Sequence, residues 1–266
     1  MKIKYTTWAA VGFLAAGSAR LIAQTNNVSP ASNAVPALTN APNAAIKYPW
    51  QGSLSLGLTL TKGNSDTSLF TGKLLASRKT PANEYSLDLD GSYGENDSVK
   101  SAELAHTDVQ WNHLFSDRLF SYVRSDALHD GIADVTYRFS IGPGAGYYFI
   151  KDKRTTLAAE GGVNWEFQDI GSGTNQIDSV YETLRLADRF EHKFSFYGAR
   201  IWQNAEVLPQ VDRFQHFLIN AEIGVEAAIA KNLSLQMYVD DAYDSEPAAD
   251  HKRNDVKLVS GVSYKF

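Results

Sequence analysis

The chain ends inside a segment that alternates apolar and polar residues, and this ending constrains the fold more than any other feature. Its last residues, Gly261 to Phe266, carry a tyrosine at the third position from the end and stop on a phenylalanine. The ends of soluble domains usually fray in water unless they are tied down, so an apolar strand that ends in this way needs a partner. In a closed antiparallel barrel the last strand pairs with the first and leaves no open edge. The ending therefore favours a closed β-barrel.

The same alternation recurs along the chain from Trp50 onward. Residues 54–61 place leucines on one face and small or polar residues on the other, and residues 85–93 set tyrosine and leucine against Asp88 and Asp90. A period of two with charges on one face is typical of strands that cross a membrane around a polar interior. A soluble β-sandwich shows the same alternation with its polar face outward, so a soluble periplasmic binding module is the alternative fold.

These segments predict an all-β protein, an antiparallel transmembrane β-barrel of about twelve strands, since single-chain bacterial barrels have an even number. Tight turns such as His192-Lys193 tend to alternate with longer loops, which places both chain ends on the short-turn, periplasmic side. The longer loops are predicted at 95–102, 129–133, 169–178, 207–212 and 244–253. The predicted strands are 50–62, 67–79, 84–94, 103–115, 118–128, 134–150, 154–168, 179–191, 194–206, 213–229, 233–243 and 254–266.

One predicted strand contains a proline. Pro143 lies between Gly142 and Gly144 and cannot donate a backbone hydrogen bond to a neighbouring strand. We therefore expect a bulge or kink at this position, and the alternative is a loop that separates two shorter strands.

Composition excludes several classes of protein. The chain has no cysteine, which removes disulfides, thiolate metal sites, cysteine nucleophiles and a lipoprotein anchor. After the N-terminus no segment offers about 18 consecutive apolar residues, so spanning helices are excluded, whereas a barrel depends on alternation. The net charge of -5 and the lack of a long basic run argue against nucleic-acid binding.

The N-terminus has the pattern of an export signal. Residues 1–23 combine Lys2 and Lys4 with a short apolar core, and cleavage is expected after Ala19 or Ala23. A retained N-terminal anchor is the alternative. Residues 24–49 are rich in Asn, Ala, Ser and Pro and cannot bury a core, so we predict a disordered periplasmic tether before a barrel over residues 50–266.

Two stretches carry a family resemblance. Both resemble a family of salt-induced outer-membrane proteins (YdiY-like, a domain of unknown function). The first is the hairpin around Gly63-Asn64-Ser65-Asp66. The second is the C-terminal run of Tyr243-Asp244-Ser245-Glu246-Pro247, Asn254-Asp255 and terminal Tyr264-Lys265-Phe266. The resemblance covers about residues 50–266 and implies an outer-membrane barrel with no established activity.

The same resemblance implies a location and partners. It implies export to the outer membrane of a Gram-negative-type bacterium and contact with outer-membrane lipid and lipopolysaccharide. Gly261, Tyr264 and Phe266 resemble the tag that the barrel-insertion machinery recognises. The sequence departs from that tag at Val259, where a polar residue is usual.

The polar faces of the predicted strands carry charges of both signs. A mixture of signs favours salt-bridge networks that fill and stiffen the barrel, whereas the alternative is a narrow passive channel for ions or small solutes. The candidate lumen-lining residues are Asp88, Asp90, Asp108, Arg124, Arg138, Glu160, Glu166, Arg185, Arg200, Glu222, Glu226, Asp240 and Lys257.

No catalytic motif stands out. His106 and His216 fall on inward faces with Ser140, and His113 on an outward one, but no Gly-x-Ser-x-Gly motif or Ser/His spacing suggests a nucleophile. We therefore predict a protein that is not an enzyme, the alternative being a barrel-embedded hydrolase acting on lipid or envelope substrates.

The acidic stretch 240–246, together with Asp250, offers carboxylates that could bind a divalent cation. It lacks the glycine-centred spacing of a calcium loop, so a solvated loop is preferred. No cofactor or metal is predicted.

Overall fold

The computed structural model describes residues 47–61, 67–171, 176–248 and 251–266. The predicted signal peptide and most of the predicted tether lie outside the described residues. None of the described residues belongs to a helix that could cross a membrane. The strands are β1 (Gln51–Thr61), β2 (Thr67–Lys79), β3 (Asn83–Asn96), β4 (Val99–Leu114), β5 (Leu119–Asp130), β6 (Val135–Lys151), β7 (Thr155–Ile170), β8 (Ile177–Lys193), β9 (Arg200–Gln210), β10 (Arg213–Ala228), β11 (Leu233–Asp244) and β12 (Asn254–Lys265).

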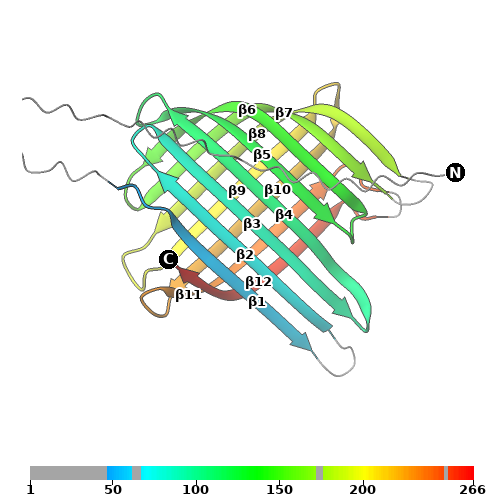
Figure 1. Ribbon diagram of the computed structural model, residues 1–266, viewed down its shortest axis with the longest axis horizontal. Coiled ribbons are helices and arrows are strands. Elements are labelled where there is room, and N and C mark those ends of the chain that lie inside the picture. The colour runs from blue at the N-terminus through cyan, green and yellow to red at the C-terminus, as the bar shows by residue number, and fades with distance from the viewer. Residues whose placement is uncertain (1–46, 62–66, 172–175, 249–250) are drawn as a thin grey trace, which may run out of the picture. The chain divides into compact units, whose positions relative to one another are not determined.

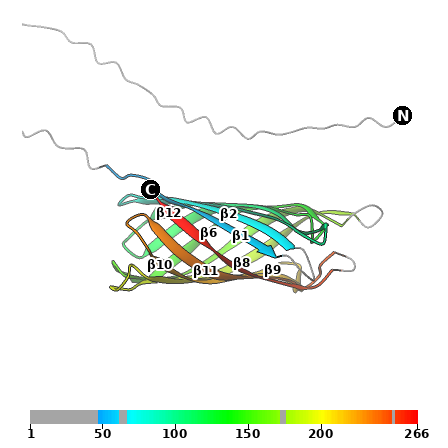
Figure 2. The same cartoon turned by 90° about the horizontal axis from the view of Figure 1, so that it is seen from below.

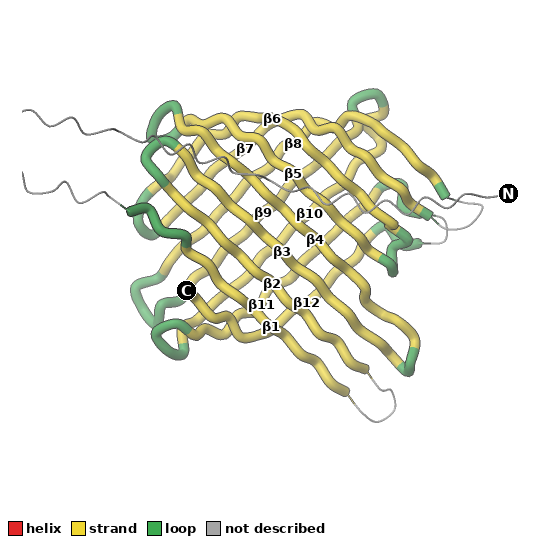
Figure 3. Tube along the Cα trace, in the orientation of Figure 1, coloured by secondary structure: helices red, strands yellow, loops and turns green. Residues whose placement is uncertain are grey.

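The strands form one closed barrel in which each strand pairs with its neighbours in sequence and β1 pairs with β12 (Figure 1). Every pairing is antiparallel. The predicted fold class and strand number are thus confirmed, and the alternative of a two-sheet sandwich is wrong. Closure satisfies backbone groups between strands and abolishes sheet edges. Loops and turns gather at the two ends of the barrel (Figure 3).

Several strands are longer than predicted. The expected loop 95–102 is wrong, because β3 and β4 continue to a turn at Asp97 and Ser98, whose φ angles are 49° and 64°. The ladder also extends into the expected loops 129–133, 169–178 and 207–212. The predicted tight turn at His192-Lys193 is wrong, because both residues belong to β8, and the chain turns at 194–199 before β9 begins. The predicted difference between short turns and long loops is therefore weaker than expected.

The bulge expected at Pro143 is absent. β6 is continuous, and its register against β7 is the same at Ile141↔Trp165 and at Gly144↔Gly162. On the other side Pro143 pairs with Val123 of β5. Gly142 and Pro143 have no ladder partners on β7, which fits the lack of a backbone N–H donor in proline. Register shifts occur instead near the two ends of β6.

The two faces of the wall differ in chemistry. Large apolar side chains are exposed on the outer face, and charged and amide side chains are buried or half-buried on the inner face. The wall formed by β2 to β6 lies over the wall formed by β8 to β11 (Figure 2), and inner side chains contact one another between them. Outer-face examples are Leu54, Leu56, Phe70, Trp111, Phe139, Trp165 and Ile223.

Aromatic rings on the inner face lie against glycines of the next strand. A Cβ on Gly146 would lie 2.3 Å from the ring of Phe120, and one on Gly144 would lie 2.3 Å from Tyr122. Phe120 and Tyr122 are almost fully buried. Glycine therefore supplies the space in which these rings are packed, so the rings reach the interior without pushing the strands apart.

Candidate functional site

Arg124 of β5 is at the centre of an ion-pair cluster inside the barrel. Its guanidinium contacts Asp108 of β4, lies 3.2 Å from Asp126 and reaches Glu206 of β9 at 3.4 Å. The side chains of Arg124 and Glu206 are each 11% exposed. Because β5 and β9 are four strands apart in the barrel order, this pair joins two separate parts of the wall.

Arg185 of β8 extends the same cluster. Its Nε lies 2.8 Å from Glu206, and its Nη1 lies 2.8 Å from Glu160 of β7. The same Nη1 donates to the hydroxyl of Tyr122 at 3.1 Å. Glu206 is thus shared by two arginines, which is a geometry that compensates buried charge through several short contacts. We call the set Arg124, Asp108, Arg185, Glu160 and Glu206 the central cluster.

His106 of β4 is held between two carboxylates. Its Nδ1 lies 2.7 Å from Asp90 and its Nε2 lies 2.7 Å from Asp126. Both ring nitrogens are therefore engaged with acids, and neither is left to take a proton from a hydroxyl group. Asp126 also contacts Arg124, so His106 belongs to the same network as the central cluster.

The other residues considered for catalysis lie apart from one another. His216 contacts Gln210 and Arg213 through Nδ1, and His113 accompanies Trp111 on the outer face beside Asn83. Ser140 is buried opposite Asp126 of β5 and Glu166 of β7 in the ladders. Among the described residues, His106, His113 and His216 thus contact acids, amides or arginine, which is the pattern of structural hydrogen bonding.

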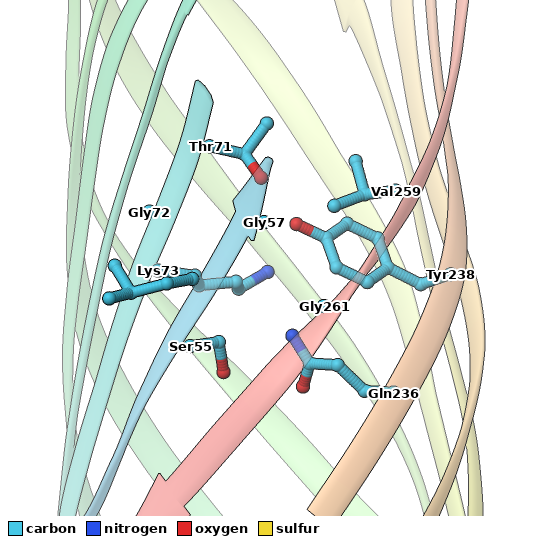
Figure 4. A pocket seen from close by; sticks show the side chains of 10 residues that line it. Ser55, Gly57, Thr71, Gly72, Lys73, Gln236, Tyr238, Val259 and Gly261 are labelled. Carbon is cyan, nitrogen blue, oxygen red and sulfur yellow. The ribbon is translucent and has the colours of Figure 1, made fainter. Parts of the chain in front are cut away.

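A second cluster lies beside the junction of β1 and β12. The ammonium group of Lys73 of β2 lies 2.7 Å from Glu222 of β10 and 3.3 Å from Asp88 of β3. It also lies 5.3 Å from the ring centre of Tyr238 of β11. Trp202 of β9 donates its indole N–H to Glu222 and packs against Tyr238. A cavity of about 10 Å³ borders Lys73 and Tyr238 (Figure 4).

Further ion pairs lie toward the ends of the barrel. Arg138 of β6 reaches Asp244 of β11 at 3.0 Å, again between non-adjacent strands. Toward the end that holds the C-terminus, Arg200 pairs with Glu226, and Lys265 contacts the same carboxylate. Glu84 of β3 pairs with Lys151 and accepts a hydrogen bond from Tyr148, both on β6.

Comparison with known proteins identifies the family. Residues 54–266 match the model of DUF481, described as a protein of unknown function. The chain belongs to this family. It is the YdiY-like family that the sequence resembles, so that expectation is confirmed. No curated protein matches the sequence.

Solved structures similar to this DUF481 protein are barrels. They include the NanC porin (7% identity, 81% of this chain and 100% of that chain, TM-score 0.51). They also include an outer membrane channel from Pseudomonas putida F1 (10% identity, 82% and 96%, TM-score 0.47) and the translocator domain of the autotransporter NalP from Neisseria meningitidis (13% identity, 82% and 87%, TM-score 0.43). At such low identity the likeness to the NanC porin shows the fold alone.

The register places every candidate lumen-lining residue of the DUF481 barrel on the inner face, and several of them meet. Asp88, Asp90, Asp108, Arg124, Glu160 and Arg185 belong to the clusters above. Glu166 accepts a hydrogen bond from Thr183, and Asp240 is the ladder partner of both Glu222 and Lys257. That these side chains line a path for water stays a prediction.

Sequence reasoning missed several members of the clusters. Lys73 is absent from the predicted set because β2 also carries the inward apolar residues Leu69 and Leu75, which obscure the alternation. Glu206 lies at the predicted end of its strand, whereas β9 continues to Gln210. An isolated charge between alternating apolar residues is the only signal that could have singled out Lys73.

The acidic stretch before Asp250 is divided among different partners. Asp244 pairs with Arg138, and Glu246 pairs with Arg213 at 3.1 Å. Asp240 and Asp241 are consecutive strand residues and so point to opposite faces of β11. Across the residues that the structure describes, no cluster of three or more metal-ligating side chains is found, and Asp250 itself lies outside them.

Proposed function

We propose that the protein is a non-catalytic outer-membrane barrel with a structural role in the envelope, its interior closed by ion pairs. The observation that carries this proposal is the central cluster. Arg124 and Arg185 both contact Glu206, and together they join strands β4, β5, β7, β8 and β9. Side chains that contact one another between opposite walls leave little room for a solute.

Burial supports closure. The side chains of Arg185 and Glu160 are only 8% and 6% exposed, so water has little access to this pair. Buried charges are stable only when they are paired and hydrogen-bonded, which requires the walls to stay close. A pore that selects by charge needs its charged groups to face water, and here the two signs neutralise each other.

The proposed location follows from the outer face and the family. An apolar outer face around a polar interior is the arrangement of barrels in lipid. We infer that the protein is exported, contacts outer-membrane lipid and lipopolysaccharide, and enters the membrane through recognition of Gly261, Tyr264 and Phe266 by the insertion machinery.

A narrow channel is the second candidate, favoured by one observation. In the cluster beside β1 and β12 the side chain of Asp88 is 28% exposed and that of Lys73 is 15% exposed, compared with 6–8% for the pair of Glu160 and Arg185. Water therefore reaches this part of the interior, and a thin aqueous path there would conduct small ions.

Conductance in planar bilayers separates the two candidates. We expect no steady openings from the folded wild-type protein. The double variant Arg124→Ala, Glu206→Ala removes a pair of opposite charges between the walls and should produce openings whose conductance scales with salt. Heat-modifiable gel mobility shows whether each sample is folded, and Lys100→Ala, which removes an exposed pair with Glu103, is the control. Salt-scaled openings of the wild-type protein would reject the closed barrel and support the channel.

A further inference from the structure

The turn between β8 and β9 gathers exposed aromatic side chains. It spans residues 194–199, and Phe194, Phe196 and Tyr197 are 38%, 57% and 83% exposed. The ring centres of Phe194 and Phe196 are 5.1 Å apart, and those of Phe196 and Tyr197 are 6.3 Å apart. The three rings thus form one continuous apolar surface, and we call this segment the aromatic turn.

Backbone hydrogen bonds hold the aromatic turn in one conformation. Phe194 donates its N–H to the carbonyl oxygen of Ala199 at 2.8 Å, and Ala199 donates to that of Phe196 at 3.0 Å. Ala228 of β10 donates to the carbonyl oxygen of Tyr197 at 3.1 Å, which ties the turn to the neighbouring hairpin. Tyr197 has a φ of 51°, a conformation that a bulky residue keeps only where its surroundings hold it.

Beside the aromatic turn the outer wall is hollowed into a groove of about 470 Å³. Phe194 and Phe196 line it together with outward side chains of β9, β10 and β11. Ile201, Val225 and Met237 form one row across these three strands, because Val225 is the ladder partner of both others. The volume lies within the range of about 300–1,000 Å³ that is usual for small-molecule sites, so the groove can receive a hydrocarbon chain.

Small residues give the groove its depth. Ala199, at the end of the aromatic turn, and Ala227 of β10 both line it, and each offers only a methyl group. The ladder partner of Ala227 is Leu235 of β11, whose side chain is much longer and is exposed. This step in side-chain length hollows the surface between the turn and β11.

The groove presents an apolar surface. Val225, Leu235 and Met237 are all exposed there. The charged residues of the same strands, Arg200 and Glu226, pair with each other at 2.9 Å on the inner face, so their charges are turned away from the groove. Hydrocarbon is the kind of ligand that such a surface favours.

The aromatic turn and the groove lie at the end of the barrel that holds the C-terminus. Leu233, where β11 begins, is the ladder partner of Tyr264 near the end of β12. With both chain ends on the periplasmic side, as the sequence predicts, this end is the periplasmic rim. Aromatic rings at the rim of a membrane barrel lie at the level of the lipid head groups. A hydrocarbon chain in the groove therefore places its head beside the turns.

The turns on both sides of the aromatic turn are basic. Lys153 and Arg154 lie between β6 and β7, and the backbone N–H of Lys193 donates to the carbonyl oxygen of Arg154 at 2.8 Å. Lys231 lies between β10 and β11. The carboxylate of Asp152 in these turns is engaged by backbone N–H groups. Among the described residues, the side chains of Lys153, Arg154 and Lys231 are exposed and form no ion pair, so they complement a phosphate group.

From these observations we infer that the groove and the basic turns form a binding site for one anionic phospholipid of the periplasmic leaflet. One acyl chain lies in the groove along Val225 and Met237, and the phosphate-bearing head lies over the aromatic turn, between Arg154 and Lys231. The groove gives the chain its place, and the flanking cations select the charge of the head. The inference rests on the proposed membrane location and goes beyond it, because it assigns one site and one class of lipid.

Native mass spectrometry of the protein in detergent counts the lipids that stay bound. We expect one phosphatidylglycerol to bind about tenfold more tightly than phosphatidylcholine with the same acyl chains, because each Lys or Arg near a head group favours an anionic lipid. Equal binding of the two lipids would overturn the choice of an anionic head. Several weakly bound molecules without one preferred molecule would overturn the single site.

The variant Ala227→Phe tests the groove. It fills the hollow with a ring and keeps the outer face apolar, so it should abolish the preferred binding of phosphatidylglycerol. The control is Ala105→Phe at an exposed, outward position of β4, which should bind lipid as the wild-type protein does. Heat-modifiable gel mobility shows whether each variant is folded. Unchanged binding in folded Ala227→Phe would reject the groove.

A pair of double variants tests the basic turns. Arg154→Gln with Lys231→Gln removes the flanking charges and should lower the binding of phosphatidylglycerol to the level of phosphatidylcholine. Lys252→Gln with Arg253→Gln removes two exposed charges just before β12, at the opposite end of the barrel, and should leave the preference intact. An equal loss in both double variants would show that net charge selects the lipid, and it would overturn the site.

A phosphatidylglycerol with a photoreactive diazirine on its acyl chain shows where the chain lies. In phosphatidylcholine vesicles that contain a small fraction of this lipid, crosslinks should gather in residues 194–201, 225–227 and 235–237, and Ala227→Phe should remove them. Crosslinks spread evenly around the barrel would overturn the site and leave the membrane location standing. A protein that stays in solution without detergent and takes no crosslink would reject the membrane location and this inference with it.

Discussion

Single glycines on the inner face decide how closely the rings of the barrel interior pack. Gly144 is the clearest case, because an added Cβ would lie 2.3 Å from the ring of Tyr122 and 2.5 Å from the backbone oxygen of Gly161. Neither neighbour is the free end of a flexible chain. The same residue type is tolerant on the outer face, where a Cβ on Gly161 would find its nearest heavy atom at 3.8 Å.

This contrast gives a prediction at the scale of the residue. Gly144→Ala should lower the free energy of unfolding by about 1–3 kcal/mol, the usual cost of overpacking. Gly161→Ala should change it by no more than about 0.5 kcal/mol. Urea unfolding in detergent micelles, followed by tryptophan fluorescence, measures both. Equal effects of the two variants would contradict the packing argument.

At the scale of the element, β12 depends on its last residue. Phe266 exchanges two backbone hydrogen bonds with Gly52, and its ring would lie 2.5 Å from a Cβ on that glycine. With only a short paired stretch between β1 and β12, these bonds form a large share of the closure. Deletion of Phe266 should therefore destabilise the barrel by about 1–3 kcal/mol, since each hydrogen bond contributes about 0.5–1.5 kcal/mol.

Refolding of purified protein in detergent tests this prediction without any insertion machinery. The conservative variant Phe266→Tyr keeps the bonds and the ring and should behave as the wild-type protein. If the deletion reduced the amount of barrel in cells but left the refolded protein equally stable, Phe266 would serve recognition rather than closure.

The turn between β6 and β7 depends on a carboxylate outside the membrane-spanning segments. Asp152 accepts hydrogen bonds from the backbone N–H groups of Arg154 at 2.8 Å and Thr155 at 2.6 Å. These bonds hold the pKa of Asp152 below its ordinary value of 3.8, and the bond from Thr155 lowers it more than the bond from Arg154. Because the pKa is lowered in the folded state, the ionised carboxylate stabilises the turn fully when the pH is above the ordinary pKa. This stabilisation is lost as the pH falls through the lowered pKa of the folded protein.

Hydrogen exchange at the amide of Thr155 should therefore show high protection at neutral pH and a loss of protection in strong acid. Asp152→Asn keeps a neutral acceptor and should show weaker protection that does not vary with pH. Protection of the wild-type turn that is constant down to the most acid conditions would contradict this account.

At the scale of the whole molecule, ion pairs between the walls act as internal cross-links. Within the central cluster the pair of Arg185 and Glu160 is nearly inaccessible to water, whereas salt screens charges through the surrounding solution, over about 3 Å at 1 M. Thermal unfolding of the barrel, followed by gel mobility, should thus change little between low and molar salt. A strong fall in the unfolding temperature with salt would indicate that the interior is wet, and it would favour the channel.

The alternation of residue types by itself predicted about twelve antiparallel strands and the face of its strand on which each charge lies, while the apolar terminal strand favoured a closed barrel over a sandwich. That information is local, because a strand places successive side chains on opposite sides whatever its neighbours are. The inward position of Arg124 or Glu160 could be read in this way.

Only the tertiary structure decided which charges meet and where the strands end. The contacts of Arg124 with Glu206 and of Lys73 with Glu222 join strands that are not adjacent, so they depend on how closely the walls approach. The continuous β6 at Pro143 and the partial pairing of β1 with β12 also depend on neighbouring strands. The physical reason is that register and wall separation are set by the packing of side chains from distant segments, whereas alternation carries only the orientation of each residue within its own strand.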